Sequence, residues 1–581
     1  MPLDSPIHNS RGIPRFNPAE TCSKSASPKV LDPRFSRLNR EPGSEVFTKF
    51  ADVKSRISWT AERQQQLREM WDRGDKAPVI AAVLGCKIGA INVARSRFGL
   101  TPRRIVPGRP KEPDDPAHKI ERVAFTTSRL MEFCTEKELV AQTGHEAHKW
   151  PLVVVKELVD NGIDACEEAE VPPVIKVAIT TGKKPKSSRR SRSRPVRPTR
   201  IVIEDNGPGI PTETISGIID YDIRISSREA YIGPTRGRQG NALKTILPMA
   251  YVLGGKIKGE TWIEALGRKH RIQFTVNQIK QEPKVNDIRS RSRVTTGTRV
   301  TVFWPDTHEA EIDPDEINNL LMEYIWVNSH LTLQFTVDGE TLIRCRATNP
   351  DWTKYRACDA TSAHWYTLEQ IERYAGALIA RDQEARRATR RKYTVREFVA
   401  QFRGMRATDK QKQILRELGA SHMSLHRFFG SETQVNHQRM EKLLRLLKKH
   451  TRVVRPELLG VIGEEHLRRM IADRGGEPKS FKYFASPGFD ADGLSYMVEI
   501  ATCPFKQWVD GKGTPGRKLI TGVNFSATLE NPFDTFRGLE GMNEILVELR
   551  AGPYAPVIVC VHYVCPHIEY LDRGKSRIGL E

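Results

Sequence analysis

The chain has 581 residues, too many for a single hydrophobic core, so several domains are expected. It carries 92 Lys and Arg against 71 Asp and Glu, a formal net charge of +21, which favours a polyanionic partner such as nucleic acid. The sequence has no apolar run long enough to span a bilayer and no signal-peptide pattern, which argues against membrane and secreted classes. Nine cysteines without a C-x-x-C pair predict reduced thiols in a cytoplasmic protein.

The first part of the chain predicts a tail, a small helical module and a linker. Residues 1–57 are rich in Pro, Ser and Arg without periodicity, which predicts disorder. Residues 58–104 hold three short helical patterns around a glycine-bearing turn, typical of a helix-turn-helix DNA-binding module. Its last helix, 88–98, would enter a major groove, although a packing module without DNA contact would show the same pattern. The Pro-rich residues 105–119 predict a stiff linker.

Residues 150–166 form the clearest predicted helix. Glu157, Asn161 and Asp164 share one face of it, because residues three and four apart are neighbours on a helix. Burying such groups costs free energy unless a polar partner or a metal answers them, so this face is either a binding surface or simply solvated. Gly162 in mid-helix costs about 1 kcal/mol against Ala, which indicates close approach of a ligand or of another backbone.

Two strand patterns follow this helix, at 174–179 and 201–205, and a basic tract at 183–194 lies between them. The tract either contacts phosphates or is a solvated loop. The second strand ends in Asp205-Asn206-Gly207-Pro208-Gly209-Ile210. An aspartate before two glycines lets a carboxylate point into a pocket while the backbone closes on a flat ligand. Taken alone, this pattern also occurs in ordinary turns.

A glycine-rich stretch at 233–241 then leads into an apolar helix, where free N–H groups and the helix dipole suit phosphates. Its spacing is neither that of a P-loop nor that of a dinucleotide fingerprint. A Gly-Thr turn at 296–298 starts another strand. Farther along, the arginines and lysine of 386–392 predict either a DNA-backbone contact or a solvated helix face. His562 and Cys565 lie in an apolar strand, which favours core packing over zinc binding.

In order and spacing, the helix and the three glycine motifs resemble the GHKL ATPases. Within that superfamily, Lys156-Glu157-Leu158-Val159-Asp160-Asn161-Gly162-Ile163-Asp164-Ala165-Cys166 is most similar to the B subunit of DNA topoisomerase VI, over about 120–581. The resemblance implies an α+β fold with a GHKL (Bergerat) ATPase sandwich at 120–350, a helical helix–two-turn–helix-like domain at 351–475 and a transducer at 476–581. The segment 58–104 is similar to the helix-turn-helix of GcrA-type bacterial regulators.

Carried over residue by residue, the topoisomerase resemblance implies roles for individual side chains. Glu157 would be the general base for the attacking water, Asn161 a ligand of Mg²⁺, and Asp205 the acceptor for the adenine amino group. Lys575, on a transducer loop, would contact the γ-phosphate and report the nucleotide state. The residues that would shape the adenine pocket are Gly207, Gly209 and Thr298. The residues that would form the lid over the phosphates are Gly237, Gln239, Gly240, Asn241, Ala242, Leu243 and Lys244.

The implied function is the Mg²⁺-dependent ATPase subunit of a type IIB topoisomerase, an isomerase. It would close as an ATP-gated homodimeric clamp on double-stranded DNA in the cytoplasm, at the nucleoid, with a separate topoisomerase VI A-like subunit as the cleaving partner. This sequence departs from the pattern at Ala242, where topoisomerase VI has glycine, in the module 58–104, and in stopping at Glu581 without a long C-terminal helix. The alternative is a DNA-bound GHKL ATPase that regulates or recruits an effector without changing DNA topology.

Overall fold

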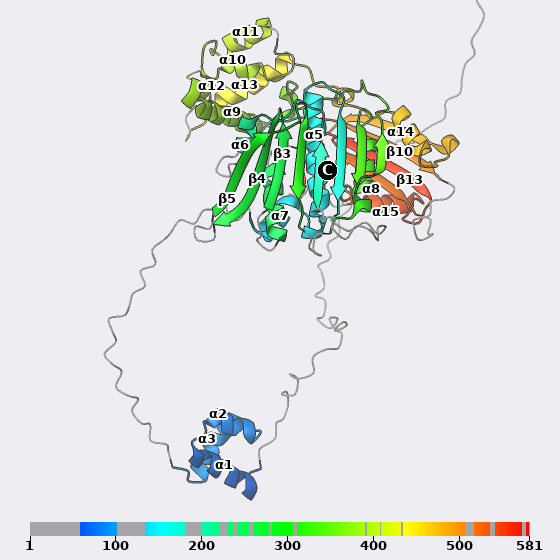
Figure 1. Ribbon diagram of the computed structural model, residues 1–581. Helices are drawn as coiled ribbons and strands as arrows, with labels where there is room; N and C mark the ends of the chain where they lie inside the picture. Colours follow the sequence, from blue (N-terminus) through cyan, green and yellow to red (C-terminus); the bar gives the residue numbers. More distant parts are fainter. Residues whose placement is uncertain are drawn as a thin grey trace, which may run out of the picture. The chain divides into compact units, whose positions relative to one another are not determined.

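The computed structural model describes residues 58–101, 134–181, 199–219, 230–237, 242–254, 259–277, 282–305, 311–389, 392–406, 408–430, 434–505, 516–534, 541–571 and 577–579. These residues belong to two compact units, Met1–Val123 and Ala124–Glu581 (Figure 1). The predicted tail 1–57, the linker 105–119 and the basic tract 183–194 lie outside the described residues.

The first unit holds three short helices, as the sequence predicted. They are α1 (Ala61–Arg73), α2 (Ala77–Val83) and α3 (Ile88–Arg97). Thr60 caps α1 by accepting from the backbone N–H of Arg63, and Gly74 ends that helix in the left-handed conformation that favours glycine. A small core forms because each helix contributes a fully buried apolar side chain: Leu67, Ile80 and Ile91.

The second unit is built on an eight-stranded mixed sheet. Its strands are β1 (Val174–Thr180), β2 (Arg200–Glu204), β3 (Gly259–Ala265), β4 (Arg268–Asn277), β5 (Glu282–Arg291), β6 (Thr298–Phe303), β7 (Thr332–Val337) and β8 (Glu340–Cys345). The order is β5-β4-β3-β6-β2-β1-β7-β8, and β1 pairs with β7 in parallel while the other neighbours are antiparallel. Strands β1 to β3 bury alternate residues, as expected when helices cover one face of a sheet.

Among the described residues, six helices lie before, between and after the first strands, and three of them pack directly on the sheet. The six are α4 (Glu136–Thr143), η2 (Ala147–Lys149), α5 (Trp150–Glu168), α6 (Thr212–Ile219), α7 (Ala242–Leu253) and α8 (Pro314–Val327). Helix α5 packs on β1 and β2, α7 on β3 and β4, and α8 on β7 and β8 (Figure 1). The predicted apolar stripe of α5 is in the core, where Val155, Val159 and Cys166 have no exposed surface. Helix α5 therefore lies against the strand that ends at the Asp205 motif.

A helical region and a second, smaller sheet complete this unit. The helical region comprises η4 (Ala363–Trp365), α9 (Leu368–Thr389), α10 (Val395–Val399), α11 (Thr408–Glu417), α12 (Leu425–Phe429), α13 (His437–His450) and η5 (Pro456–Leu459). It is followed by α14 (Glu464–Ala472), η6 (Pro478–Ser480), β9 (Lys482–Phe489), β10 (Ser495–Pro504), β11 (Lys518–Val523), β12 (Ser526–Ala527), α15 (Met542–Glu548) and β13 (Val557–Val564). The second sheet has the order β12-β11-β13-β10-β9. The predicted α+β class is confirmed.

Three sequence expectations can be compared with the described residues only. Each of the eight cysteines among them is a free thiol. No single helix of the described part is long and apolar enough to cross a membrane, whereas α2 and α3, bent by 100°, reach that length and composition together. The arginine side chains predicted as a basic cluster within 386–391 lie outside what the structure describes, so that cluster stays a prediction.

Candidate functional site

Helix α5 divides its polar residues between two surroundings. Glu157 is half-buried and Asn161, one turn later, is exposed. Three further acids, Asp160, Asp164 and Glu167, are buried with at most 8% exposure. The sequence grouped Asp164 with Glu157 and Asn161, but the structure buries Asp164 among protein groups. Of these three, Glu157 and Asn161 have exposed surface that a ligand could reach.

The Asp205 motif folds as a tight turn held by its own carboxylate. Oδ1 of Asp205 accepts from the backbone N–H of Gly207 at 2.8 Å and from that of Thr298 at 3.1 Å. The backbone N–H of Asp205 donates to the carbonyl of Thr298 at 2.9 Å, so the turn is bound to the start of β6. Burial raises the pKa of Asp205, and the hydrogen bonds from Gly207 and Thr298 oppose that rise. The carboxylate is thus fixed in orientation and partly desolvated.

Glycines surround this carboxylate because there is no room for side chains. A Cβ on Gly162 of α5 would lie 3.0 Å from Cδ1 of Ile175 and 3.2 Å from Cβ of Asp205. Gly162 is therefore a site of close approach, as predicted, but the approaching groups are side chains of the protein and not the ligand or backbone that the sequence suggested. Gly297, with φ of +72°, leaves only 1.9 Å between a built Cβ and the carbonyl oxygen of Asp205. A Cβ built on Gly209, whose φ is +82°, would lie 3.0 Å from the carbonyl oxygen of Gly297.

The structure thus brings together four residues predicted for the adenine pocket: Asp205, Gly207, Gly209 and Thr298. The predicted phosphate lid is described only at its two ends. A Cβ built on Gly237 would have none of the described atoms within 4 Å. Ala242, Leu243 and Lys244 form the first turn of α7, and Leu243 and Lys244 are buried. The remaining predicted contacts, which lie outside the described residues, are Gln239, Gly240, Asn241 and Lys575.

Arg236, directly before the lid glycines, does not face solvent. Its side chain has no exposed surface and forms an ion pair with Asp164 at 2.6 Å and with Glu167 at 2.7 Å. Nη2 also donates to Oδ1 of Asn328 at 2.6 Å, and Nε to the carbonyl oxygen of Phe525 at 3.1 Å. The guanidinium therefore joins α5, the end of α8 and the second sheet. Its charge is neutralised by carboxylates of the protein itself.

Two further groups complete this cluster. Nζ of Lys354 lies 3.2 Å from Oε2 of Glu167, and Nε2 of His330 lies 3.0 Å from Oε1 of the same residue. Burial alone would raise the pKa of Glu167, but Arg236 and Lys354 outweigh it and hold that pKa well below its usual value. Burial lowers the pKa of His330. The carboxylates of Asp164 and Glu167 are thus neutralised by Arg236 and Lys354, while His330 is neutral. Pairing of this kind is what allows charged groups to be buried.

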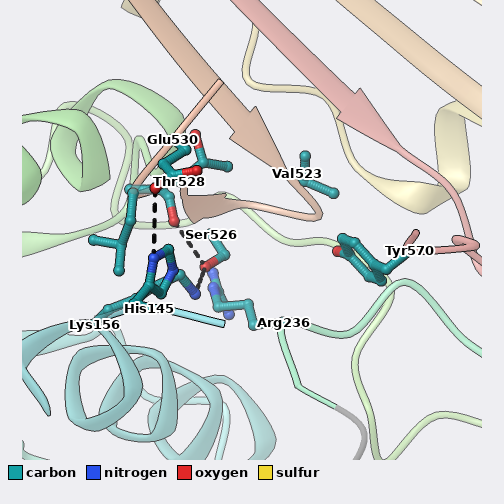
Figure 2. A pocket seen from close by; sticks show the side chains of 10 residues that line it. His145, Lys156, Arg236, Val523, Ser526, Thr528, Glu530 and Tyr570 are labelled. Atoms are coloured by element: carbon teal, nitrogen blue, oxygen red, sulfur yellow. Dashed lines mark hydrogen bonds and ion pairs between the residues drawn. The ribbon is translucent and has the colours of Figure 1, made fainter. Parts of the chain in front are cut away.

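A second polar bridge joins α5 to the hairpin β11–β12. Asp160 accepts from Ser526 Oγ at 2.8 Å, from Lys156 Nζ at 2.8 Å and from the Tyr324 hydroxyl at 2.8 Å. Beside it lies a cavity of about 30 Å³, enough for about two water molecules. Figure 2 shows Lys156 and Ser526 meeting on one side of this cavity and Tyr570 on the other. The cavity is too small for a nucleotide.

Sequence reasoning missed the partners of both bridges. The spacing of Lys156 and Asp160, four residues apart on a helix, was a readable signal for that ion pair. The partners Arg236, Lys354 and Ser526 had no such signal, because they come from distant segments. Arg236 lies in the glycine-rich stretch that the sequence associated with phosphates, but no role of its own was predicted for it.

His562 is a core residue, as the sequence favoured. Its side chain is fully buried, and Nδ1 lies 3.2 Å from Oε2 of Glu499, which is also fully buried. Within the described ranges, no group of three or more His, Cys, Asp and Glu side chains could hold a metal ion. Zinc binding at Cys565 therefore has no support from this part of the chain.

Comparison with known proteins gives similarity to topoisomerases. No family model matches the chain. The B subunit of type 2 DNA topoisomerase 6 from Archaeoglobus fulgidus is 26% identical over 443 residues, covering 74% of this chain and 66% of that protein. The protein of the same name from Methanococcoides burtonii is 34% identical over 137 residues, 23% of this chain and 20% of that protein. The chain therefore spans less than two thirds of the length of these relatives.

Among solved structures, the ATPase region of Saccharomyces cerevisiae topoisomerase II is 10% identical, with a TM-score of 0.30, over 74% of this chain and 76% of that one. The predicted resemblance to the B subunit of topoisomerase VI is confirmed as a sequence similarity. The resemblance of 58–104 to GcrA-type regulators stays a prediction.

Replacing Gly297 by alanine tests the packing around Asp205. We expect Gly297→Ala to lower the free energy of unfolding by about 2–4 kcal/mol, because a Cβ there meets the Asp205 carbonyl and strains a left-handed backbone. Gly267→Ala is the matched control, since Gly267 has φ of +73° but nothing within 4 Å of a built Cβ. Chemical unfolding measures both. Equal losses would contradict a specific contact at Asp205.

Proposed function

We propose that the second unit binds and hydrolyses ATP. The observation that carries this proposal is the fixed carboxylate of Asp205 beside Gly162 of α5, the same helix that holds Glu157 and Asn161 in less buried positions. A flat base could lie against Gly207 and Gly209 and donate its amino hydrogens to Asp205. Because two N–H groups already hold one carboxylate oxygen, the other oxygen would meet the ligand without reorganisation.

Hydrolysis would depend on the open face of α5. Glu157 would accept a proton from the water that attacks the γ-phosphate, a role that needs a carboxylate near the ligand and not locked in an ion pair. Asn161 is exposed one turn away, and its amide oxygen suits Mg²⁺, which retains several waters and binds few protein groups. When bound, Mg²⁺ would neutralise charge on the phosphates. The lid glycines and Lys575 would contact the phosphates, as the family resemblance implies.

We further infer that this ATPase is the B-type subunit of a topoisomerase VI-like machine. The supporting finding is the 26% identity that spans 74% of this chain. In that role the chain would dimerise on ATP around double-stranded DNA and work with a separate A-like subunit that cleaves the strands. Relaxation of supercoiled DNA by the chain together with such a subunit would test it. Relaxation that requires ATP supports the proposal, and its absence with an active ATPase favours the alternative.

That alternative, a DNA-bound regulatory ATPase, is favoured by one feature of the first unit. Residues 76–101 contain four Lys and Arg and no acid, and α3 exposes Asn92, Val93, Ser96 and Arg97 on adjoining positions. Amide, methyl, hydroxyl and guanidinium groups on one helix are the kinds that read base edges in a major groove. Site-specific binding of this sort suits recruitment to chosen DNA sites.

Two substitutions separate binding from hydrolysis. Glu157→Gln should keep ATP affinity within about threefold and reduce turnover by about 100-fold or more, because the base acts only in the transition state. Asp205→Asn should keep the turn, since an amide oxygen can still accept from Gly207 and Thr298, but should weaken ATP binding by placing an NH₂ toward the adenine amino group. Isothermal titration and phosphate release measure these effects. Wild-type turnover in Glu157→Gln would refute the assignment.

Duplex binding should weaken steeply with salt. If about five phosphates are neutralised, log affinity should fall against log salt with a slope of about −4 to −5. Deleting residues 1–104 should reduce discrimination between DNA sequences more than it changes this slope, because base reading is assigned to the first unit and phosphate contacts are spread over the chain. Fluorescence anisotropy over a salt series provides the measurement. An affinity independent of salt would count against DNA as the partner.

A further inference from the structure

The turn between β11 and β12 is strained at a bulky residue. Val523 pairs with Ser526, so Asn524 and Phe525 form a two-residue hairpin turn, and both have positive φ, 51° and 65°. Asparagine tolerates this conformation, whereas a turn of this kind favours glycine at the second position. The Phe525 ring is nevertheless fully buried. Strain of this kind persists only where the surroundings over-determine the conformation.

Both backbone groups of Phe525 are held by side chains from distant segments. Its carbonyl accepts from Nε of Arg236 at 3.1 Å and from Nδ2 of Asn328 at 2.9 Å. Its N–H donates to Nε2 of His562 at 3.1 Å, and the other nitrogen of that ring lies 3.2 Å from Glu499. A continuous buried path of hydrogen bonds therefore runs from the residue before the lid glycines into the second sheet.

Glu499 extends this path to the start of α14. Its two oxygens accept from the backbone N–H groups of Ile462, at 2.9 Å, and Gly463, at 3.0 Å. Gly463 is the N-cap of α14, the first helix after the helical region. The same carboxylate accepts from Tyr483 on β9. The connection between the helical region and the second sheet is thus fixed by the residue that holds His562.

The ring of Phe525 contacts the segment that leads into the helical region, at Trp352, and the segment that leads out of it, at Gly460. It lies 4.9 Å from the Trp352 ring and 4.4 Å from the His562 ring. A Cβ on Gly460 would come within 2.8 Å of its Cζ and 2.6 Å of Cβ of Lys354. The segment that enters the helical region and the segment that leaves it therefore close on this ring. A change in the Asn524–Phe525 turn would therefore shift both of these segments.

We propose that Arg236 is a positioning residue that links the nucleotide site to the second sheet through the Asn524–Phe525 turn. This inference rests on the proposed ATPase function and assigns Arg236 a role other than phosphate binding. The Arg236 guanidinium pairs with Asp164 and Glu167 of α5, the helix of the proposed base. Its Nε also donates to the carbonyl oxygen of Phe525. Movement of either region changes the position of the other.

Arginine suits this role and lysine does not. The five hydrogen bonds of Arg236 go to four groups around its planar fork: two carboxylates, one amide oxygen and one carbonyl. A lysine keeps the charge that Asp164 and Glu167 require but has one compact donor group, so it cannot reach all four acceptors. Arg236→Lys therefore removes the link while leaving charge in the cluster.

The test compares Arg236→Lys with Arg356→Lys in the full chain. Arg356 also pairs with two acids, Glu170 and Asp359, but is partly exposed and has no part in the polar path described above. Without nucleotide, amide hydrogen exchange over 518–527 should quicken in Arg236→Lys and stay as in wild type in Arg356→Lys. With a non-hydrolysable ATP analogue, wild type should slow exchange over 518–527, and Arg236→Lys should not.

In the same variants, Arg236→Lys should lower kcat by about tenfold or more while the Kd for the analogue changes by less than about threefold, because misplacement affects chemistry more than binding. Exchange over 518–527 that is unchanged without nucleotide, or still slowed by the analogue, would overturn the inference. If Arg236→Lys does not fold, Asn328→Ala, which cuts the amide contacts and keeps both ion pairs, should show the same effects in smaller degree. A wild type that binds no analogue would refute the proposed function instead, and exchange without nucleotide would still test the link.

Discussion

The arrangement of the second unit depends on the neutralisation of two buried acids. Asp164 and Glu167 are one turn apart on α5, and neither could stay ionised in the core without cations. The cations, Arg236 and Lys354, come from the approach to α7 and from the segment before the helical region. Because a buried charge that loses its partner costs several kcal/mol, these segments are held to α5 as a set.

This constraint explains why one helix can serve both binding and structure. The side of α5 with Asp160, Asp164 and Glu167 is occupied by Lys156, Ser526 and the cations of the cluster. That occupation leaves Glu157 and Asn161 as the acidic and amide residues in the middle of α5 that have exposed surface. A general base must be free of a tight ion pair, so the neutralisation of its neighbours is a condition for the proposed chemistry.

The sequence could predict those features that depend on residues close together in the chain. The helix 150–166 and the strands around 201–205 follow from periodicity, and the Asp205 turn follows from glycines within a few residues. Gly162 could be read as a close-approach site, although the approaching groups, Ile175 and Asp205, could not be named. Asp164 was grouped with the open face because its partner, 72 residues away, leaves no periodic trace. The lid residues and Lys575 remain predictions, since they lie outside the described residues.

Arg236 shows how position in a motif can mislead about the use of a charge. Beside glycines, an arginine is naturally read as a phosphate ligand, because free N–H groups and cations both favour anions. Burial reverses that reading, because the Arg236 guanidinium has no exposed surface and its five N–H groups make five hydrogen bonds to protein acceptors. Contacts to the phosphates of a bound nucleotide are therefore assigned to groups other than the Arg236 side chain. The Arg236 side chain is instead bound to α5 and to the carbonyl oxygen of Phe525, which is the arrangement on which the proposed link between the two regions rests.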